Sequence, residues 1–187
     1  MTKKIVHCIR HGESTFNAHY RLCATDPLHF DARLSPEGER QVAAAAERLR
    51  DVPYELIVST PLTRALQTTL GLFAGHPAFA TLHVHCLHRE RLESSCDVGR
   101  APAALLADFP SLDLAHLKDI WWHDAEARDP RGFAIEPGTV FDGRVREFRA
   151  WLSARPETLI AVVGHGTFFY HLTGEQLPNC GVVALEL

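Results

Sequence analysis

The sequence predicts an α/β fold, a three-layer α/β/α sandwich in which a largely parallel sheet carries helices on both faces. Short apolar runs alternate along the chain with segments whose apolar residues recur at helical spacing. Neither a repeat nor a low-complexity linker interrupts this alternation, which is typical of sheets covered on both faces. With 187 residues and 46% apolar composition the chain can bury one substantial core. We therefore expect a single domain over residues 1–187.

The first half of the chain supplies two strands, each followed by a helix. Residues 5–9, IVHCI, mix apolar and β-branched side chains and are typical of a strand. The next helix begins with conventional signals, since Ser35 can cap it and Pro36 suits its first turn. Residues 55–60, ELIVST, predict a buried strand, after which Pro61 can begin a second helix.

The middle of the chain has weaker patterns. Residues 81–87, TLHVHCL, predict a third strand, and a helix is expected around residues 102–109. Residues 111–138 combine two tryptophans with prolines and many charges, which indicates a long connection with a short helix. Trp121 and Trp122 are candidates either for a lid over a pocket or for a small core.

The last third returns to a regular pattern. Thr139 can cap a helix whose apolar residues recur at helical spacing. Residues 158–166, TLIAVVGHG, predict a strand that ends in histidine and glycine. A short helix over residues 166–172 and a final strand over residues 181–187, GVVALEL, complete the chain.

Composition and charge disfavour several classes of function. The net charge is -4, whereas nucleic-acid binding usually requires a basic excess or face. The five cysteines are odd in number and form no Cys-x-x-Cys pair, as expected of reduced thiols. The basic residues 1–4 precede an apolar segment that His7 and Arg10 interrupt too soon for a signal peptide. No run approaches the ~20 apolar residues that cross a bilayer, so we expect a cytoplasmic protein without a membrane partner.

Charged side chains follow three of the predicted strands. Arg10 and His11 follow the first strand, Arg64 follows the second, and His165 follows the strand before the last. Ligands of such sheets bind outside the carboxyl ends of the strands, so these side chains should meet at one edge. Two arginines and two histidines at one edge predict an anion site.

Phosphate suits this site better than a carboxylate. Arginine forks bind tetrahedral oxyanions with paired hydrogen bonds. Gly12 and Gly166 have no side chain, so an anion can closely approach their backbone N–H groups. Histidine, with an ordinary pKa of ~6.5, presents a nitrogen lone pair near neutral pH, so His11 can accept a phosphoryl group covalently.

Four motifs in order then resemble a known family. They are RHGES at 10–14 with Asn17 beyond it, LSxxGxxQ at 34–41, SxPLxRAxQT at 59–68 and GHG at 164–166. Together with the ending LTGEQLPNCGVVAL, they are similar to the histidine phosphatase superfamily over nearly the whole chain. The resemblance implies the phosphoglycerate mutase-like fold.

The family also implies roles for the site residues. His11 would be the nucleophile that forms a phosphohistidine. Three residues would hold the phosphoryl oxygens and stabilise the transition state: Arg10, Arg64 and His165. Asn17 and Gly166 would add phosphate contacts, while Ser59 and Glu13 would position their neighbours.

The general acid should be a carboxylate from the segment after the third strand. Glu90, Glu93 and Asp97 are the candidates there. Glu90 is preferred because its spacing to the Cys96-Asp97-x-Gly99 sequence resembles that of less familiar phosphatase-like members. More familiar members carry Gly-x-x-Glu-Gly after the acid, a pattern that this sequence lacks. Glu93 remains the alternative proton donor.

The leading function is a metal-independent phosphomonoesterase acting on a small phosphorylated molecule, although a phosphoprotein stays open as its substrate. A mutase is the alternative within catalysis, but its usual inserted segments are missing. A phosphate-binding module without catalysis is disfavoured because His11 is present. A nucleotide site on the GHG sequence lacks the rest of its fingerprint. Residues 87–138 should select the substrate or cover the pocket, and the oligomeric state stays open.

No cofactor is expected, because arginine and imidazole groups supply the charge that a metal ion supplies elsewhere. The sequence HVHCLH, residues 83–88, is a possible metal motif, but a second ligand cluster at a recognised spacing is missing. We expect these histidines to face solvent or to line the rim of the substrate pocket.

Overall fold

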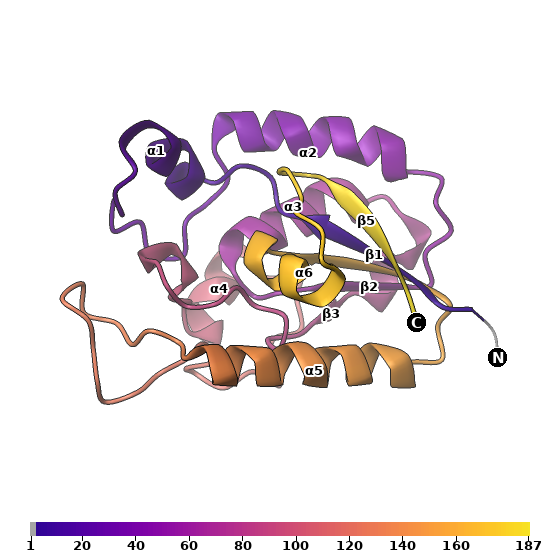
Figure 1. Cartoon of the computed structure of the whole chain (residues 1–187). Helices are drawn as coiled ribbons and strands as arrows, with labels where there is room; N and C mark the ends of the chain where they lie inside the picture. The colour runs from indigo at the N-terminus through magenta and orange to yellow at the C-terminus, as the bar shows by residue number, and fades with distance from the viewer. Residues whose placement is uncertain (1–2) are drawn as a thin grey trace.

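A five-stranded sheet forms the centre of the molecule, in the order β3-β2-β4-β1-β5. The computed structural model describes residues 3–187, so the first two residues of the basic N-terminal segment lie outside it. The strands are β1 (Ile5–Arg10), β2 (Leu56–Ser59), β3 (His83–Val84), β4 (Leu159–Gly164) and β5 (Val182–Glu186). The first four are parallel, while β5 runs antiparallel beside β1 at one edge (Figure 1). The predicted, largely parallel sheet is confirmed.

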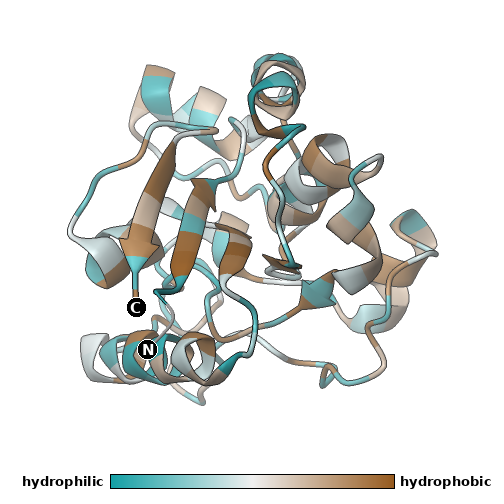
Figure 2. Cartoon of the chain, turned by 90° about the vertical axis from the view of Figure 1, so that its right-hand side faces the viewer, coloured by the Kyte–Doolittle hydropathy of each residue, from teal (hydrophilic) through white to brown (hydrophobic). Residues whose placement is uncertain are grey.

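Helices cover both faces of this sheet, which confirms the predicted three layers. The helices are α1 (Thr15–Cys23), α2 (Pro36–Leu49), α3 (Thr63–Phe73), α4 (Pro102–Asp108), α5 (Gly138–Ala154) and α6 (Gly166–Thr173). Successive strand residues point to opposite faces. Ile9 accordingly packs in the apolar cluster of α2 and α3, and Cys8 packs in that of α5 and α6. Figure 2 shows the strands as mostly hydrophobic ribbons between these layers.

A third apolar cluster lies at the β3 edge and explains the tryptophans. Leu66 of α3, Val84 of β3 and Leu105 of α4 pack there with Trp121, which is 5% exposed. The Trp121 indole donates a hydrogen bond to the Arg100 carbonyl at 2.8 Å. Trp121 is therefore a core residue rather than part of a lid. The predicted short helix within residues 111–138 is wrong, because turns and irregular backbone fill this segment as far as Gly138, where α5 begins.

Three element boundaries differ from the sequence prediction. Strand β3 keeps only two residues, because a 3₁₀ helix, Pro77–Thr81, occupies the chain before it. Helix α3 begins at Thr63 rather than at Pro61. The N–H and hydroxyl of Thr63 donate hydrogen bonds to the Asp31 carboxylate. Helix α5 has Pro137 as its N-cap, so Thr139 does not cap it.

The strand register brings the predicted site residues together. Arg10, the last residue of β1, pairs with Gly164, the last residue of β4. His11 and His165 therefore leave the sheet side by side at its carboxyl edge. Within residues 3–187, no helix is long and apolar enough to cross a membrane.

Candidate active site

His11 and His165 form the floor of the site. The His11 N–H donates to the Gly164 carbonyl at 3.0 Å, which fixes the two strand ends against each other. The imidazole centroids are 5.2 Å apart, and the two side chains are 3% and 0% exposed. The prediction that both histidines meet at one sheet edge is confirmed.

The His11 ring is held in one tautomer. Its Nδ1 lies 2.6 Å from the Gly12 carbonyl oxygen, which can only accept, so Nδ1 carries the proton. Its Nε2 then carries a lone pair, which accepts a hydrogen bond from Arg64 Nε at 3.2 Å. Burial, followed by the charges of Arg64 and Arg10, lowers the pKa of His11 well below its ordinary value. The imidazole is therefore neutral at physiological pH.

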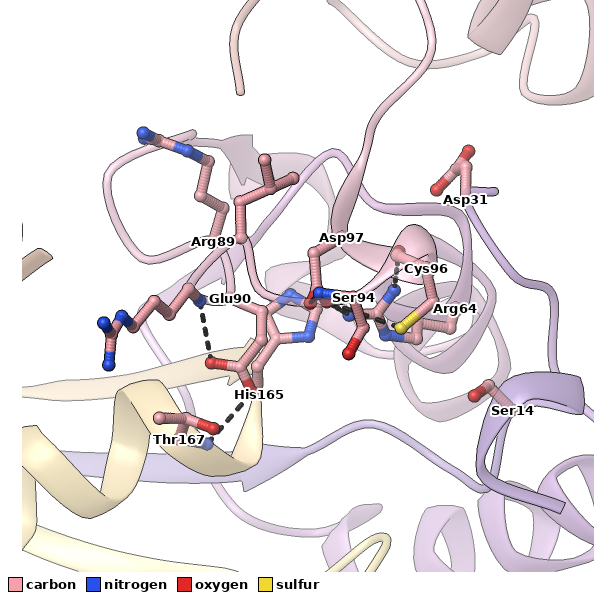
Figure 3. Close-up of polar contacts among 12 residues, drawn as sticks. Ser14, Asp31, Arg64, Arg89, Glu90, Ser94, Cys96, Asp97, His165 and Thr167 are labelled. Atoms are coloured by element: carbon pink, nitrogen blue, oxygen red, sulfur yellow. Dashed lines mark hydrogen bonds and ion pairs between the residues drawn. The ribbon is translucent and has the colours of Figure 1, made fainter. Parts of the chain in front are cut away.

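Arg64 lies beside His11 and is almost fully buried. Its Nη1 donates to the Cys96 carbonyl at 2.5 Å, and its Nη2 donates to Asp97 Oδ1 at 2.8 Å (Figure 3). An arginine near a helix N-terminus predicts a nearby anion. In the structure that charge comes from the chain itself, since Asp97 pairs with Arg64 and Asp31 caps the same helix.

Two buried nitrogen atoms of the site have no hydrogen-bond partner among the described residues. Arg10 donates from Nη1 to the Leu177 carbonyl at 2.7 Å, but its Nε is unpaired. His165 Nε2 contacts the Thr60 hydroxyl at 2.7 Å, but its Nδ1 is unpaired. An unsatisfied buried polar group costs about 1–3 kcal/mol. Arg10 also lines the cavity in front of His11, and His165 lies beside His11.

The glycines and Asn17 make contacts of their own within the chain. The Gly12 N–H donates to Thr68 Oγ1 at 3.1 Å, so it is not free for an anion. Asn17 Oδ1 accepts hydrogen bonds from the N–H and hydroxyl of Ser14, which caps α1. Gly166 lets the Arg10 side chain pass close by, because a Cβ there would lie 3.2 Å from Arg10 Nε.

The two candidate proton donors occupy different places. Glu90 accepts hydrogen bonds from the backbone N–H groups of Thr167, at 2.9 Å, and Phe168, at 3.1 Å, at the start of α6 (Figure 3). Glu93 pairs with Arg91 at 3.0 Å and is about half exposed. Both carboxylates line the cavity in front of His11. Only Glu90 is fixed at the sheet edge by backbone donors.

Two neighbouring cavities with shared lining residues open at this site. The first, of about 190 Å³, is lined by Arg10, His11, Phe16, Asn17, Arg64, Glu90, Arg91, Glu93, Ser94, Cys96, Asp97 and Thr167. The second, of about 280 Å³, shares Arg10, Glu90 and Thr167 with the first and adds Tyr170 and Gln176. Of the predicted site residues, Asn17 lines the first cavity and Gly166 lines the second.

A buried ion cluster behind Glu90 was not predicted. The Glu136 carboxylate, fully buried, accepts two hydrogen bonds from Arg144, at 2.8 and 2.6 Å, and one from Arg89 at 3.1 Å. Arg144 also donates to the carbonyls of residues 87, 89 and 90. This cluster holds the backbone that carries Glu90, and no motif in the sequence marks it.

The remaining candidates lie behind the site or away from it. Glu13 accepts from the Ser35 hydroxyl at 2.8 Å, and Ser59 accepts from the Thr69 hydroxyl at 2.8 Å. His83 and His85 are half-buried, whereas His88 is fully buried with its Nε2 3.1 Å from the Val163 carbonyl oxygen, so for His88 the expectation of a solvent or rim position is wrong. No group of three or more metal-ligating side chains is present within residues 3–187.

Comparison with known proteins supports the resemblance. The family model of the histidine phosphatase superfamily (branch 1) matches residues 6–178. A phosphoglycerate mutase-like protein of Arabidopsis thaliana is 26% identical, with 95% of this chain and 76% of that protein covered. A glucosyl-3-phosphoglycerate phosphatase of Mycolicibacterium vanbaalenii is 29% identical, with 90% and 72% covered. The solved structure of a mycobacterial glucosyl-3-phosphoglycerate phosphatase with VO3 is 25% identical and covers 97% of this chain and 92% of its own, with a TM-score of 0.63.

Proposed function

The chain belongs to the histidine phosphatase superfamily (branch 1), and we propose that it hydrolyses a phosphomonoester without a metal, through a phosphohistidine on His11. One observation carries the proposal. The His11 imidazole is neutral and fixed in one tautomer, its Nε2 lone pair accepts from Arg64 Nε, and His11 lines one cavity together with Arg10 and Arg64. This is the arrangement that nucleophilic attack on a bound phosphoryl group requires.

The first step transfers the phosphoryl group to the enzyme. His11 Nε2 attacks phosphorus, the bond to the leaving oxygen breaks, and Glu90 gives that oxygen a proton. Arg10, Arg64 and His165 hold the phosphoryl oxygens, where their N–H donors balance the charge that develops. Arg64 Nε must turn from His11 Nε2 to a phosphoryl oxygen, which frees the lone pair.

The second step returns the enzyme to its starting state. Glu90, now ionised, takes a proton from a water molecule as the water oxygen attacks phosphorus. The N–P bond breaks, inorganic phosphate leaves, and His11 is again neutral. One carboxyl group thus acts first as acid and then as base.

The substrate is proposed to be a small phosphorylated molecule. The two neighbouring cavities, of about 190 and 280 Å³, fit a compact leaving group. Residues 87–138 are proposed to select it, because Arg91, Glu93 and Ser94 line the cavity in front of the nucleophile. A screen of phosphorylated metabolites would identify the leaving group.

The mechanism is tested by comparing the wild-type protein with His11→Ala on an aryl phosphate. The wild type should release phosphate and, after an acid-free quench, retain a base-stable, acid-labile phosphoenzyme, whereas His11→Ala should do neither. His171→Ala, which removes a partly exposed histidine paired with Asp142, is the matched control and should behave as wild type. Equal turnover by all three proteins would refute the mechanism. A phosphoenzyme without net phosphate release would favour a mutase.

A further inference from the structure

A buried carboxylate that this mechanism does not use lies against Arg64. Asp97 is 6% exposed and ends a 3₁₀ turn, Ser95–Asp97. Its Oδ1 accepts from Arg64 Nη2, while the carbonyl of the preceding Cys96 accepts from Arg64 Nη1. Two consecutive residues of one turn therefore hold both terminal nitrogens of the guanidinium (Figure 3).

The turn is closed by a bond of its own and is tied to two other parts of the chain. The Ser94 N–H donates to Asp97 Oδ2 at 3.2 Å, which closes the turn. The N–H and hydroxyl of Ser95 donate to the Asp26 carboxylate, at 2.8 and 2.5 Å. Arg131 donates to the same carboxylate at 2.8 Å and to the residue 93 carbonyl at 2.9 Å. Asp97 is thus presented to Arg64 by a rigid support.

The fixed guanidinium has a consequence for the nucleophile. With its terminal nitrogens held, Arg64 presents Nε toward His11 Nε2 in the structure. The three bonds to His11, Cys96 and Asp97 use three of the five N–H donors, and Nε joins the remaining two when it turns to a phosphoryl oxygen. Loss of the Asp97 carboxylate would let Arg64 rotate away from both His11 and the anion.

The charge of Asp97 also opposes the anion that Arg64 attracts. The ionisable groups that face it or line the same cavity come from several elements: Arg64 of α3; Glu90, Arg91 and Glu93 after β3; Cys96 of its own turn; and Arg10 and His11 at the end of β1. When ionised, three carboxylates balance three arginines before any substrate arrives. Burial raises the pKa of Asp97 to about 6, against the opposing effect of Arg64. A proton on Asp97 would relieve its repulsion of a bound dianion.

We propose that Asp97 is a positioning residue, which fixes Arg64 against His11 and takes up a proton when a tetrahedral dianion binds. The proposal rests on the proposed function, because that function places a phosphoryl group at this site. Protonation keeps the contact, since a neutral carboxyl oxygen still accepts from Arg64. Binding of the dianion should therefore weaken as pH rises and Asp97 ionises.

Inorganic sulfate is the probe, because it stays a dianion across the whole range and needs no turnover. Calorimetry on the full chain should show sulfate binding to wild type about tenfold more weakly at about pH 8 than at about pH 5, the effect of a one-unit shift in the pKa of Asp97. Burial lowers the pKa values of His11 and His165 well below 6.5, and any proton that they take up on binding is common to wild type and Asp97→Asn. Asp97→Asn, which keeps an acceptor oxygen but no charge, should therefore lose the tenfold difference.

The positioning role has a separate readout. Asp97→Ala should lower kcat on an aryl phosphate more than Asp97→Asn does, because only the amide can still accept from Arg64. Asp142→Asn, an exposed substitution on α5, is the matched control and should keep the wild-type pH profile. A wild-type sulfate profile in Asp97→Asn, or wild-type kcat in a folded Asp97→Ala, would overturn the proposal. Absence of sulfate binding to wild type would overturn it too, whereas only activity retained by His11→Ala would refute the phosphohistidine mechanism.

Discussion

Replacement of Glu90 by glutamine separates two roles that the structure gives to one side chain. Its carboxylate oxygens accept from the N–H groups of Thr167 and Phe168, so Glu90 stabilises the start of α6. The same carboxyl group faces the cavity of the nucleophile, where the mechanism uses it as a proton donor. Glutamine keeps one acceptor oxygen but has neither the charge nor the acidic proton.

The two losses differ in size. Loss of one hydrogen bond costs about 0.5–1.5 kcal/mol, and loss of a negative charge at a helix N-terminus costs about 0.3–1 kcal/mol. We therefore expect Glu90→Gln to be less stable by about 1–2 kcal/mol and still folded. General acid catalysis contributes about 100-fold to 10,000-fold, which corresponds to about 3–5 kcal/mol of the activation barrier. The loss of rate should exceed what the loss of stability explains.

The assay compares esters whose leaving groups differ in acidity. Glu90→Gln should hydrolyse an alkyl phosphate about 100-fold or more slowly, because a poor leaving group needs the proton. An aryl phosphate, whose leaving oxygen is stable without that proton, should be affected much less. Urea unfolding of the same samples gives the stability change. Equal losses on both esters would refute the role of Glu90, and a selective loss in Glu93→Gln alone would assign the proton to Glu93.

Two further predictions concern stability. Glu136→Gln should destabilise the fold by about 3–5 kcal/mol, because buried Arg89 and Arg144 lose their counter-charge; a shift in urea unfolding of less than about 1 kcal/mol would contradict this. Stability should also fall as pH decreases from about 6.5 toward about 4. Burial lowers the pKa of His85 from 6.5 to about 4 in the folded protein. Between these pH values His85 therefore takes up a proton in the unfolded chain but not in the folded one, which favours unfolding. His85→Gln should reduce the slope of unfolding free energy against pH, and the same slope in both proteins would show that His85 does not contribute.

The sequence predicts the strands and the residues at their ends, for a physical reason. A buried parallel strand needs a continuous apolar run, and such runs stand out wherever they occur. Parallel strands end at one edge, so the residues that follow them meet without any further information. Arg10, His11, Arg64 and His165 all follow this rule. For β3 the pattern of residues 81–87 predicts a longer strand than the structure has, because only His83 and Val84 pair with β2 at the edge of the sheet.

The support around the site could not be predicted in the same way. Asp97 reaches Arg64 from 33 residues further along the chain, within a segment that has no periodicity. Glu136 pairs with Arg89 across 47 residues, and both lie in irregular backbone. Such pairs depend on how loops fold over the sheet edge, and a charged residue in a loop usually signals only contact with solvent. The sequence therefore shows the groups that would touch phosphate better than those that hold them in place.

The hydrogen bond between Arg64 Nε and His11 Nε2 couples reactivity to occupancy of the site. In the structure the guanidinium N–H occupies the lone pair that attack on phosphorus needs. A phosphoryl oxygen is charged and accepts a stronger hydrogen bond from a guanidinium than a neutral imidazole does. On the proposed mechanism, substrate binding therefore moves the Arg64 donor from the nitrogen to the oxygen and exposes the nucleophile in the same step. Because Asp97 and the Cys96 carbonyl hold the other side of the guanidinium, this movement is a small rotation rather than a displacement of Arg64, and it reverses when phosphate leaves.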